Sequence, residues 1–202
     1  MSLFVKICGL KTAELVEACA SAGADAIGLN FYPPSPRYIA PRQAASLAKA
    51  APRELLLVAV MLRPAQKHLE EVLSAFTPDC LQADAASLAR LRLPSGMRAM
   101  PVYRDHEAFK PNDVPAGTRC LFEGRLSGVG QRPSWERAAE LARQREIMLA
   151  GGLDPANVGE AVRRVRPWGV DVSSGVESAR GVKDSKAVRA FIRAARQADG
   201  QS

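Results

Sequence analysis

The chain has 202 residues, of which 47% are hydrophobic and only 5% aromatic, and its formal net charge is +7. This length fits one large domain spanning residues 1–202, with a core built mostly from alanine, valine and leucine. The longest apolar run, residues 55–62, is far below the ~20 residues of a membrane span, which disfavours a membrane protein. The arginines are spread along the chain without a recognition signature, which disfavours nucleic-acid binding.

Short apolar runs alternate with segments of helical periodicity along the whole chain. The predicted strands are residues 3–7, 26–29, 55–61, 80–82, 97–102, 119–122, 147–150 and 168–170. The predicted helices are residues 12–23, 41–51, 65–76, 87–93, 135–144, 155–165 and 185–198, with a weak helical signal at 105–112. Residues 55–61 are apolar throughout, so this strand is expected to be fully buried.

This alternation predicts one α/β domain with a parallel sheet, because no linker or low-complexity segment divides the chain. A doubly wound open sheet is the alternative, but it usually needs fewer units. Eight strand–helix units favour a single (β/α)₈ TIM barrel with short loops.

The number and spacing of the cysteines indicate the cellular compartment of the protein. Four of them, at positions 8, 19, 80 and 120, form no CxxC pair and no metal-ligand spacing. The first residues lack a basic segment followed by a long apolar one, so no export signal is expected. We therefore expect reduced thiols in a cytoplasmic protein.

Two late segments carry the pattern of a phosphate site. Residues 147–152 form an apolar run that ends in a glycine pair, and residues 171–175 end a strand with Asp-Val-Ser-Ser-Gly. Backbone N–H groups, hydroxyls and a helix N-terminus can bind one anion there. In a TIM barrel the loops after strands seven and eight often share a phosphate. The predicted phosphate-binding residues are Gly151, Gly152, Ser173, Ser174 and Gly175.

The ends of the predicted strands are the expected places for catalytic groups, because active sites of TIM barrels lie at that face. Two ionisable side chains at these ends, Cys8 and Glu123, stand out as a possible base and acid. A thiol that acts as a base near neutral pH needs a lowered pKa, and a glutamate that acts as an acid needs a raised one.

Four segments together carry a family resemblance. They are residues 6–10 (Lys-Ile-Cys-Gly-Leu), 31–38 (Phe-Tyr-Pro-Pro-Ser-Pro-Arg-Tyr), 149–153 (Leu-Ala-Gly-Gly-Leu) and 171–177 (Asp-Val-Ser-Ser-Gly-Val-Glu). In this order, over essentially the whole chain, they resemble phosphoribosylanthranilate isomerase of tryptophan biosynthesis. The resemblance implies a TIM barrel without a cofactor, either monomer or homodimer. It also implies an Amadori rearrangement of N-(5-phosphoribosyl)anthranilate to 1-(2-carboxyphenylamino)-1-deoxyribulose 5-phosphate.

The resemblance also implies residue roles. Cys8 is the general base, Arg37 binds the anthranilate carboxylate, and Gln82 and Asp171 lie by the substrate. Glu123 stands where the family commonly has an aspartate as general acid, and we expect the longer glutamate to take that role. A second departure follows Gln82, where Ala-Asp-Ala-Ala replaces a His-Gly-Asp-Glu-like segment.

Two other functions remain open from the sequence. One is another aldose–ketose isomerase acting on a sugar phosphate, such as the related histidine-pathway enzyme, although that relative has an aspartate where this chain has Cys8. The other is a barrel that binds a phosphate-bearing ligand without catalysis, which the glutamate at position 123 makes conceivable.

Overall fold

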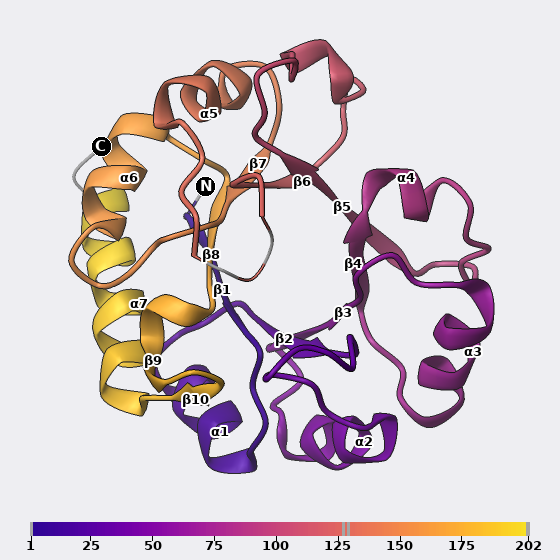
Figure 1. Cartoon of the computed structure of the whole chain (residues 1–202). Coiled ribbons are helices and arrows are strands. Elements are labelled where there is room, and N and C mark those ends of the chain that lie inside the picture. The colour runs from indigo at the N-terminus through magenta and orange to yellow at the C-terminus, as the bar shows by residue number, and fades with distance from the viewer. Residues whose placement is uncertain (1, 127, 129, 201–202) are drawn as a thin grey trace.

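Eight parallel strands close into a barrel in the order in which they occur along the chain. The structure, a computed structural model, describes residues 2–126, 128 and 130–200. The strands form the inner ring in Figure 1, and β8 pairs with β1 to close it. Their bounds are β1 Phe4–Cys8, β2 Ala26–Asn30, β3 Leu56–Val60, β4 Cys80–Asp84, β5 Arg98–Arg104, β6 Cys120–Glu123, β7 Ile147–Leu149 and β8 Gly169–Val172. The predicted TIM barrel is confirmed.

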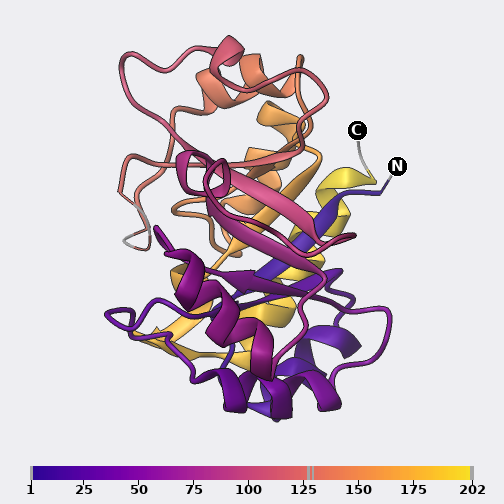
Figure 2. The same ribbon diagram turned by 90° about the vertical axis from the view of Figure 1, so that its right-hand side faces the viewer.

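Helices cover the outside of the barrel (Figures 1 and 2). Their bounds are α1 Ala13–Ser21, α2 Pro41–Ala50, α3 Gln66–Ala75, α4 Ala85–Leu88, α5 Trp135–Ala142, α6 Val158–Val165 and α7 Ser185–Asp199. Thr12 caps α1, because its Oγ1 accepts from Leu15 N at 3.4 Å. Leu3 before β1 lies beside the end of α7, because Leu3 N donates to Asp199 Oδ2 at 2.8 Å (Figure 2). Across the described residues, no helix is long and apolar enough to cross a membrane.

The structure departs from the predicted elements in the middle of the chain. The helix predicted at 87–93 is a single turn, α4, that begins two residues earlier. Residues 105–112 form no α-helix; the stretch, which is fully described, contains only the 3₁₀ turn η1, Pro111–Asp113. Pro111 disfavours helical backbone at the residue before it, which explains why the weak signal fails. The fifth strand is therefore followed by a loop.

Three further differences concern the start of α6, the segment after β8 and the burial of β3. Helix α6 begins at Val158, three residues later than predicted. After β8 come a 3₁₀ turn, η2 (Ser174–Val176), and an unpredicted hairpin of β9 (Glu177–Ala179) and β10 (Val182–Lys183). Strand β3 is not fully buried, since Leu56, Leu57 and Val60 are only partly covered. Two of them line cavities inside the barrel, Leu56 at one end and Val60 at the other.

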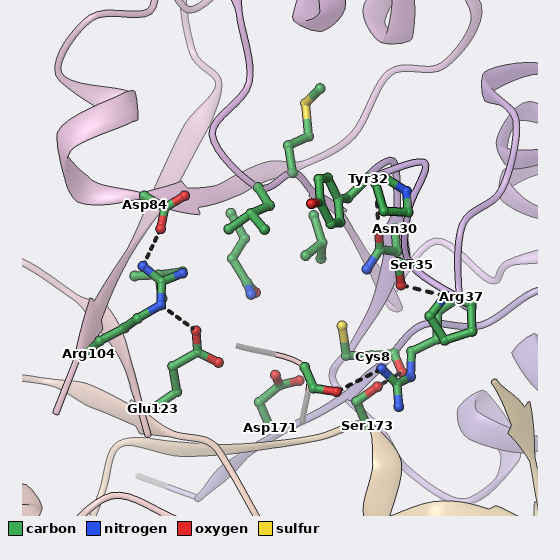
Figure 3. A pocket seen from close by; sticks show the side chains of 18 of the residues that line it. Cys8, Asn30, Tyr32, Ser35, Arg37, Asp84, Arg104, Glu123, Asp171 and Ser173 are labelled. Carbon is green, nitrogen blue, oxygen red and sulfur yellow. Dashed lines mark hydrogen bonds and ion pairs between the residues drawn. The ribbon is translucent and has the colours of Figure 1, made fainter. Parts of the chain in front are cut away.

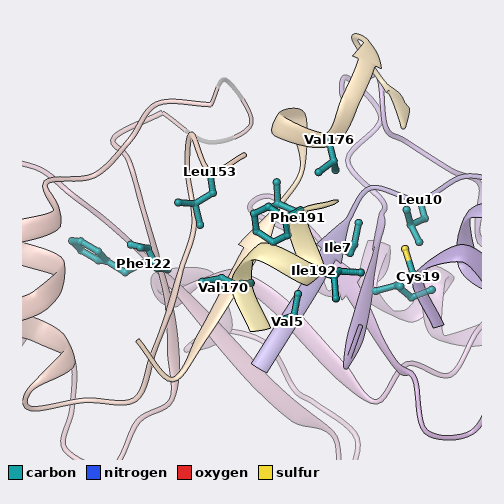
Figure 4. Close-up of a cluster of buried hydrophobic side chains, with 14 of the residues drawn as sticks. Val5, Ile7, Leu10, Cys19, Phe122, Leu153, Val170, Val176, Phe191 and Ile192 are labelled. Atoms are coloured by element: carbon teal, nitrogen blue, oxygen red, sulfur yellow. The ribbon is translucent and has the colours of Figure 1, made fainter. Parts of the chain in front are cut away.

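The main hydrophobic core lies between the barrel and the helices. Val5 and Ile7 of β1 and Val170 of β8 pack there with Phe191 and Ile192 of α7 (Figure 4). Successive side chains of a strand point to opposite faces, so the alternate residues of β1 face the barrel interior. That alternation places Lys6 and Cys8 inside the barrel.

Lys6 forms a buried ion pair across the closing seam of the barrel. It lies in register with Asp171, and Lys6 Nζ is 2.7 Å from Asp171 Oδ1. Burial acts to lower the pKa of Lys6, but the charge and hydrogen bond of Asp171, together with Cys8 and Cys80, outweigh burial, and the pKa of Lys6 is raised. Both side chains are nine-tenths buried or more, so removal of one partner leaves the other charge largely desolvated.

Lys6→Met is therefore expected to lower the free energy of unfolding by about 3–5 kcal/mol, because it leaves the Asp171 carboxylate buried without its cation. Urea titration of both proteins measures the difference. The double variant Lys6→Met/Asp171→Asn, which removes both charges, is expected to recover most of the loss. A single variant within 1 kcal/mol of wild type would contradict the expectation.

Candidate active site

A cavity of about 220 Å³ opens at the carboxyl ends of the barrel strands. Six of the predicted site residues line it together, from β1, β4, β6, β8 and the loops after β2 and β8: Cys8, Arg37, Gln82, Glu123, Asp171 and Ser173. Figure 3 shows Cys8 and Glu123 on opposite sides of this cavity. The other four predicted residues, Gly151, Gly152, Ser174 and Gly175, are not among those that line it.

Cys8 is the last residue of β1 and is buried. Burial raises the pKa of the Cys8 thiol above its usual value, and the Asp171 carboxylate raises it further. The positive charges of Lys6, Lys183 and Arg37 act in the opposite direction without outweighing burial. The thiol is therefore protonated near neutral pH in the unliganded protein. The lowered pKa that a base would need is not a property of the empty site.

Glu123 ends β6 and pairs with an arginine on the neighbouring strand. Arg104 lies in register with Glu123, and Arg104 Nε is 3.3 Å from Glu123 Oε1. The same guanidinium donates through Nη1 to Asp84 Oδ1 at the end of β4. Asp84 Oδ2 in turn accepts from the backbone N–H of Arg63 at 3.0 Å. Two carboxylates therefore share one guanidinium at the cavity wall (Figure 3).

Arg37 is held by Glu177 at the start of the β9–β10 hairpin. Its Nε and Nη2 donate to the two carboxylate oxygens of Glu177 at 2.6 and 2.9 Å, and Nη1 donates to Gly128 O at 3.3 Å. Burial raises the pKa of Glu177, but hydrogen bonds from Arg37, Lys183 and the Gly181 N–H outweigh it and lower that pKa to about 2. The Arg37 guanidinium, which is predicted to bind a ligand carboxylate, thus already binds the carboxylate of Glu177.

Lys183 connects this ion pair to the end of β8. Its Nζ donates to Glu177 Oε1 at 2.7 Å, to Ser173 O at 2.8 Å and to Ser173 Oγ at 3.1 Å. Ser173 Oγ donates to Cys8 O at 3.1 Å, which links β8 to β1. A buried ammonium thus lies beneath one of the predicted phosphate-binding serines.

The predicted glycines lie where three loops pack closely. A Cβ on Gly175 would lie 1.9 Å from Leu153 O, and one on Gly151 would lie 2.4 Å from Gln131 O. Gly152 has a positive φ of 62°, and Arg132 Nε donates to its carbonyl oxygen at 3.2 Å. The loop after β6 therefore lies against the loops after β7 and β8. Glycine is needed at these positions for close packing of backbones.

The sequence interpretation missed several cavity-lining side chains: Tyr32, Asp84, Arg104 and Arg180. Arg104 was missed because β5 extends two residues beyond the predicted end at residue 102. Arg180 lies in the turn of the unpredicted hairpin. A continued alternation through Met100, Val102 and Arg104 is the signal that could have revealed an inward-facing arginine.

Comparison with known proteins identifies the family. The profile of the family described as N-(5'phosphoribosyl)anthranilate (PRA) isomerase matches residues 5–194. The chain belongs to this isomerase family.

Relatives in this family match the chain in sequence and in structure over nearly its full length. N-(5'-phosphoribosyl)anthranilate isomerase of Bradyrhizobium diazoefficiens (strain JCM 10833) is 39% identical over 211 residues, covering 97% of this chain and 95% of the relative. The solved phosphoribosyl anthranilate isomerase of Thermus thermophilus superposes with a TM-score of 0.82 at 27% identity, covering 95% and 98% of the two chains.

A second solved phosphoribosyl anthranilate isomerase was crystallised in complex with reduced 1-(o-carboxyphenylamino)-1-deoxyribulose 5-phosphate. It superposes with a TM-score of 0.79 at 28% identity, covering 96% of this chain and 99% of that one. This member of the isomerase family therefore shares its barrel with a protein that holds a phosphorylated ligand bearing an aryl carboxylate.

The cysteine environment predicts slow alkylation of the protein at neutral pH. Burial raises the pKa of all four thiols, to about 12 for Cys19 and Cys120 and about 11 for Cys80, and the pKa of Cys8 is raised as well. Because the thiolate is the reactive form, labelling of Cys8 by iodoacetamide is expected to rise about tenfold per pH unit through the range 7–9. Peptide mass spectrometry follows each cysteine separately. Rapid labelling of Cys8 at pH 7 with a plateau below pH 8 would contradict a raised pKa.

Proposed function

We propose that this family member catalyses the Amadori rearrangement of N-(5'-phosphoribosyl)anthranilate in tryptophan biosynthesis, with Cys8 as base and Glu123 as acid. The observation that supports this most is that the two side chains line one cavity at the catalytic face of the barrel. Their positions on opposite walls allow acid and base to act on different atoms of one sugar.

The acid acts first. Glu123 gives a proton to the furanose ring oxygen, the C1–O bond breaks, and the electron pair of the amine nitrogen forms a cationic Schiff base. Cys8, as thiolate, then removes the proton from C2, and the C2–H electron pair neutralises the nitrogen to give an enolamine. Tautomerisation of the enolamine yields the ketone. No redox partner is needed, because hydrogen only moves within the sugar, and we expect no cofactor requirement.

The substrate itself supplies a positive charge that favours the Cys8 thiolate, which the empty site does not stabilise enough. Burial keeps the thiol protonated, although Lys6, Lys183 and Arg37 already act to lower its pKa. A cationic Schiff base beside the sulfur adds another positive charge, which favours the thiolate. The base is therefore activated when the ring has opened.

Binding groups surround the reacting sugar. Ser173, at the cavity and in contact with Lys183, and the backbone of Gly151, Gly152, Ser174 and Gly175 form the proposed phosphate site. Arg37 keeps N–H groups beyond the three that it donates to Glu177 and Gly128, and these bind the aryl carboxylate. Gln82 and Asp171 contact the sugar from the cavity floor.

The proposed setting is the cytoplasm, supported by four free, buried cysteines. The assembly is a monomer or a homodimer. A Thermotoga maritima relative is described as a dimeric isomerase from which monomers were generated.

Genetic complementation tests the proposed activity. Expression of this chain is expected to restore growth without tryptophan to a bacterial strain that lacks the isomerase, and Cys8→Ser is expected not to. Immunoblotting verifies that both proteins accumulate. Failure of the accumulated wild-type chain to restore growth would overturn the proposed activity.

A further inference from the structure

Asp84, Arg104 and Glu123 form a cluster for which the proposed mechanism has no use beyond the acid itself. They end three adjacent strands, β4, β5 and β6, and all three line the cavity. Their side chains are 11%, 23% and 13% exposed, respectively. An arginine this enclosed loses much of its hydration, so its contacts with carboxylates are stronger than those of surface pairs.

The cluster fixes the position of the Glu123 carboxyl, which the length of the glutamate side chain would otherwise leave variable. A glutamate at the end of β6 carries its carboxyl one methylene farther than an aspartate would, and it has one more rotatable bond. Arg104, directly beside it in register, meets Glu123 Oε1 at 3.3 Å. Arg104 is itself anchored, because Asp84 accepts from its Nη1 and the Arg63 backbone N–H holds Asp84. The carboxyl of Glu123 is thereby drawn toward β5 at a fixed point.

The charge balance of the cluster explains what the second carboxylate, Asp84, does beside Arg104. With both carboxylates ionised, two negative charges face one guanidinium, so the cluster carries a net charge of −1. One proton on Glu123 leaves a neutral Asp84–Arg104 pair. Asp84 thus offsets the tendency of Arg104 to hold Glu123 in its ionised form. Other ionisable groups face the cavity from the remaining elements: Cys8, Tyr32, Arg37, Asp171 and Arg180. Asp84 and Arg104 also line a second cavity, with Arg63, His106, Asp113 and Arg125.

We propose that Arg104 is a positioning residue that places the Glu123 carboxyl for proton donation, and that Asp84 balances its charge so that Glu123 can carry the proton. This inference rests on the proposed function, in which Glu123 is the acid. It assigns a role to Asp84 and Arg104, which are not among the candidate site residues predicted from the sequence.

The positioning role is tested by coupling between positions 104 and 123. Arg104→Gln is expected to lower kcat about 10- to 100-fold with little change in KM, and Arg104→Lys to restore part of the loss. In a Glu123→Asp background the shortened carboxyl no longer reaches residue 104, so adding Arg104→Gln is expected to change kcat less than twofold. Arg98→Gln, on the same strand at the other end of the barrel, is the matched control. Equal losses from Arg104→Gln in both backgrounds would overturn the inference.

The charge-balancing role is tested without turnover. Carbon-13 NMR follows protonation of the Glu123 carboxyl, identified as the signal that disappears in Glu123→Gln. Its titration midpoint is expected to move to higher pH in Arg104→Gln, where the cation is gone, and to lower pH in Asp84→Asn, where the competing anion is gone. Shifts in the same direction, or none, would overturn the inference. If the two variants show these shifts but the folded wild type has no turnover, the proposed function alone is overturned.

Discussion

Replacing Cys8 with serine is expected to lower kcat about a thousandfold while KM changes little. The hydroxyl is nearly isosteric with the thiol, so the cavity keeps its shape. A serine hydroxyl, however, ionises far less readily than even a thiol whose pKa burial has raised. Rates are compared by the loss of phosphoribosylanthranilate fluorescence.

Cys80→Ser is the matched control, because Cys80 also faces the barrel interior but lines a cavity at its opposite end. We expect it to keep wild-type kcat once its fold is verified by circular dichroism. A Cys8→Ser protein that keeps more than a tenth of wild-type activity would exclude Cys8 as the base.

Glu123→Gln is expected to lower kcat by about 10²–10⁴-fold, because an amide has the shape of the acid but cannot supply its proton. The amide oxygen can still face Arg104, so the loss reports proton transfer rather than collapse of the cluster. Glu123→Asp is expected to keep part of the activity, since it retains the acid but shortens its reach. The same fluorescence assay measures both variants.

Glu146→Gln provides a control for this substitution, because Glu146 pairs with Arg119 on the exposed surface. It is expected to leave kcat unchanged. If turnover survives Glu123→Gln at more than a tenth of the wild-type rate, the acid lies elsewhere, and Asp171, which also lines the cavity, is the next candidate.

Much of the barrel could be predicted from local patterns. Short apolar runs marked all eight strands, because buried parallel strands need continuous apolar sequence. The errors fall where local signals are weak. Helix α4 is a single turn, and the only helical structure that begins within residues 105–112 is the short 3₁₀ turn η1. The strands of the β9–β10 hairpin have only three and two residues, and Gly181 in its turn packs closely against Pro36 of a distant loop.

The positions of the candidate site residues were predictable, but their partners were not. Cys8 and Glu123 follow strands, and strand ends converge in any such barrel. The Arg37–Glu177 pair joins residues 140 positions apart, and the Lys6–Asp171 pair joins residues 165 apart. Such contacts depend on barrel closure and on the register of neighbouring strands. They determine that Arg37 is already paired in the empty site. The raised pKa of Cys8 comes mainly from burial of the thiol, which also depends on closure of the barrel.

Turnover by the purified wild-type chain tests the central claim most directly. Phosphoribosylanthranilate is generated in situ, and the decay of its fluorescence is followed together with formation of the carboxyphenylamino-deoxyribulose phosphate. We expect the protein to accelerate the decay with matching product, without any added cofactor. A protein with a folded circular dichroism spectrum that produces no acceleration would contradict the claim.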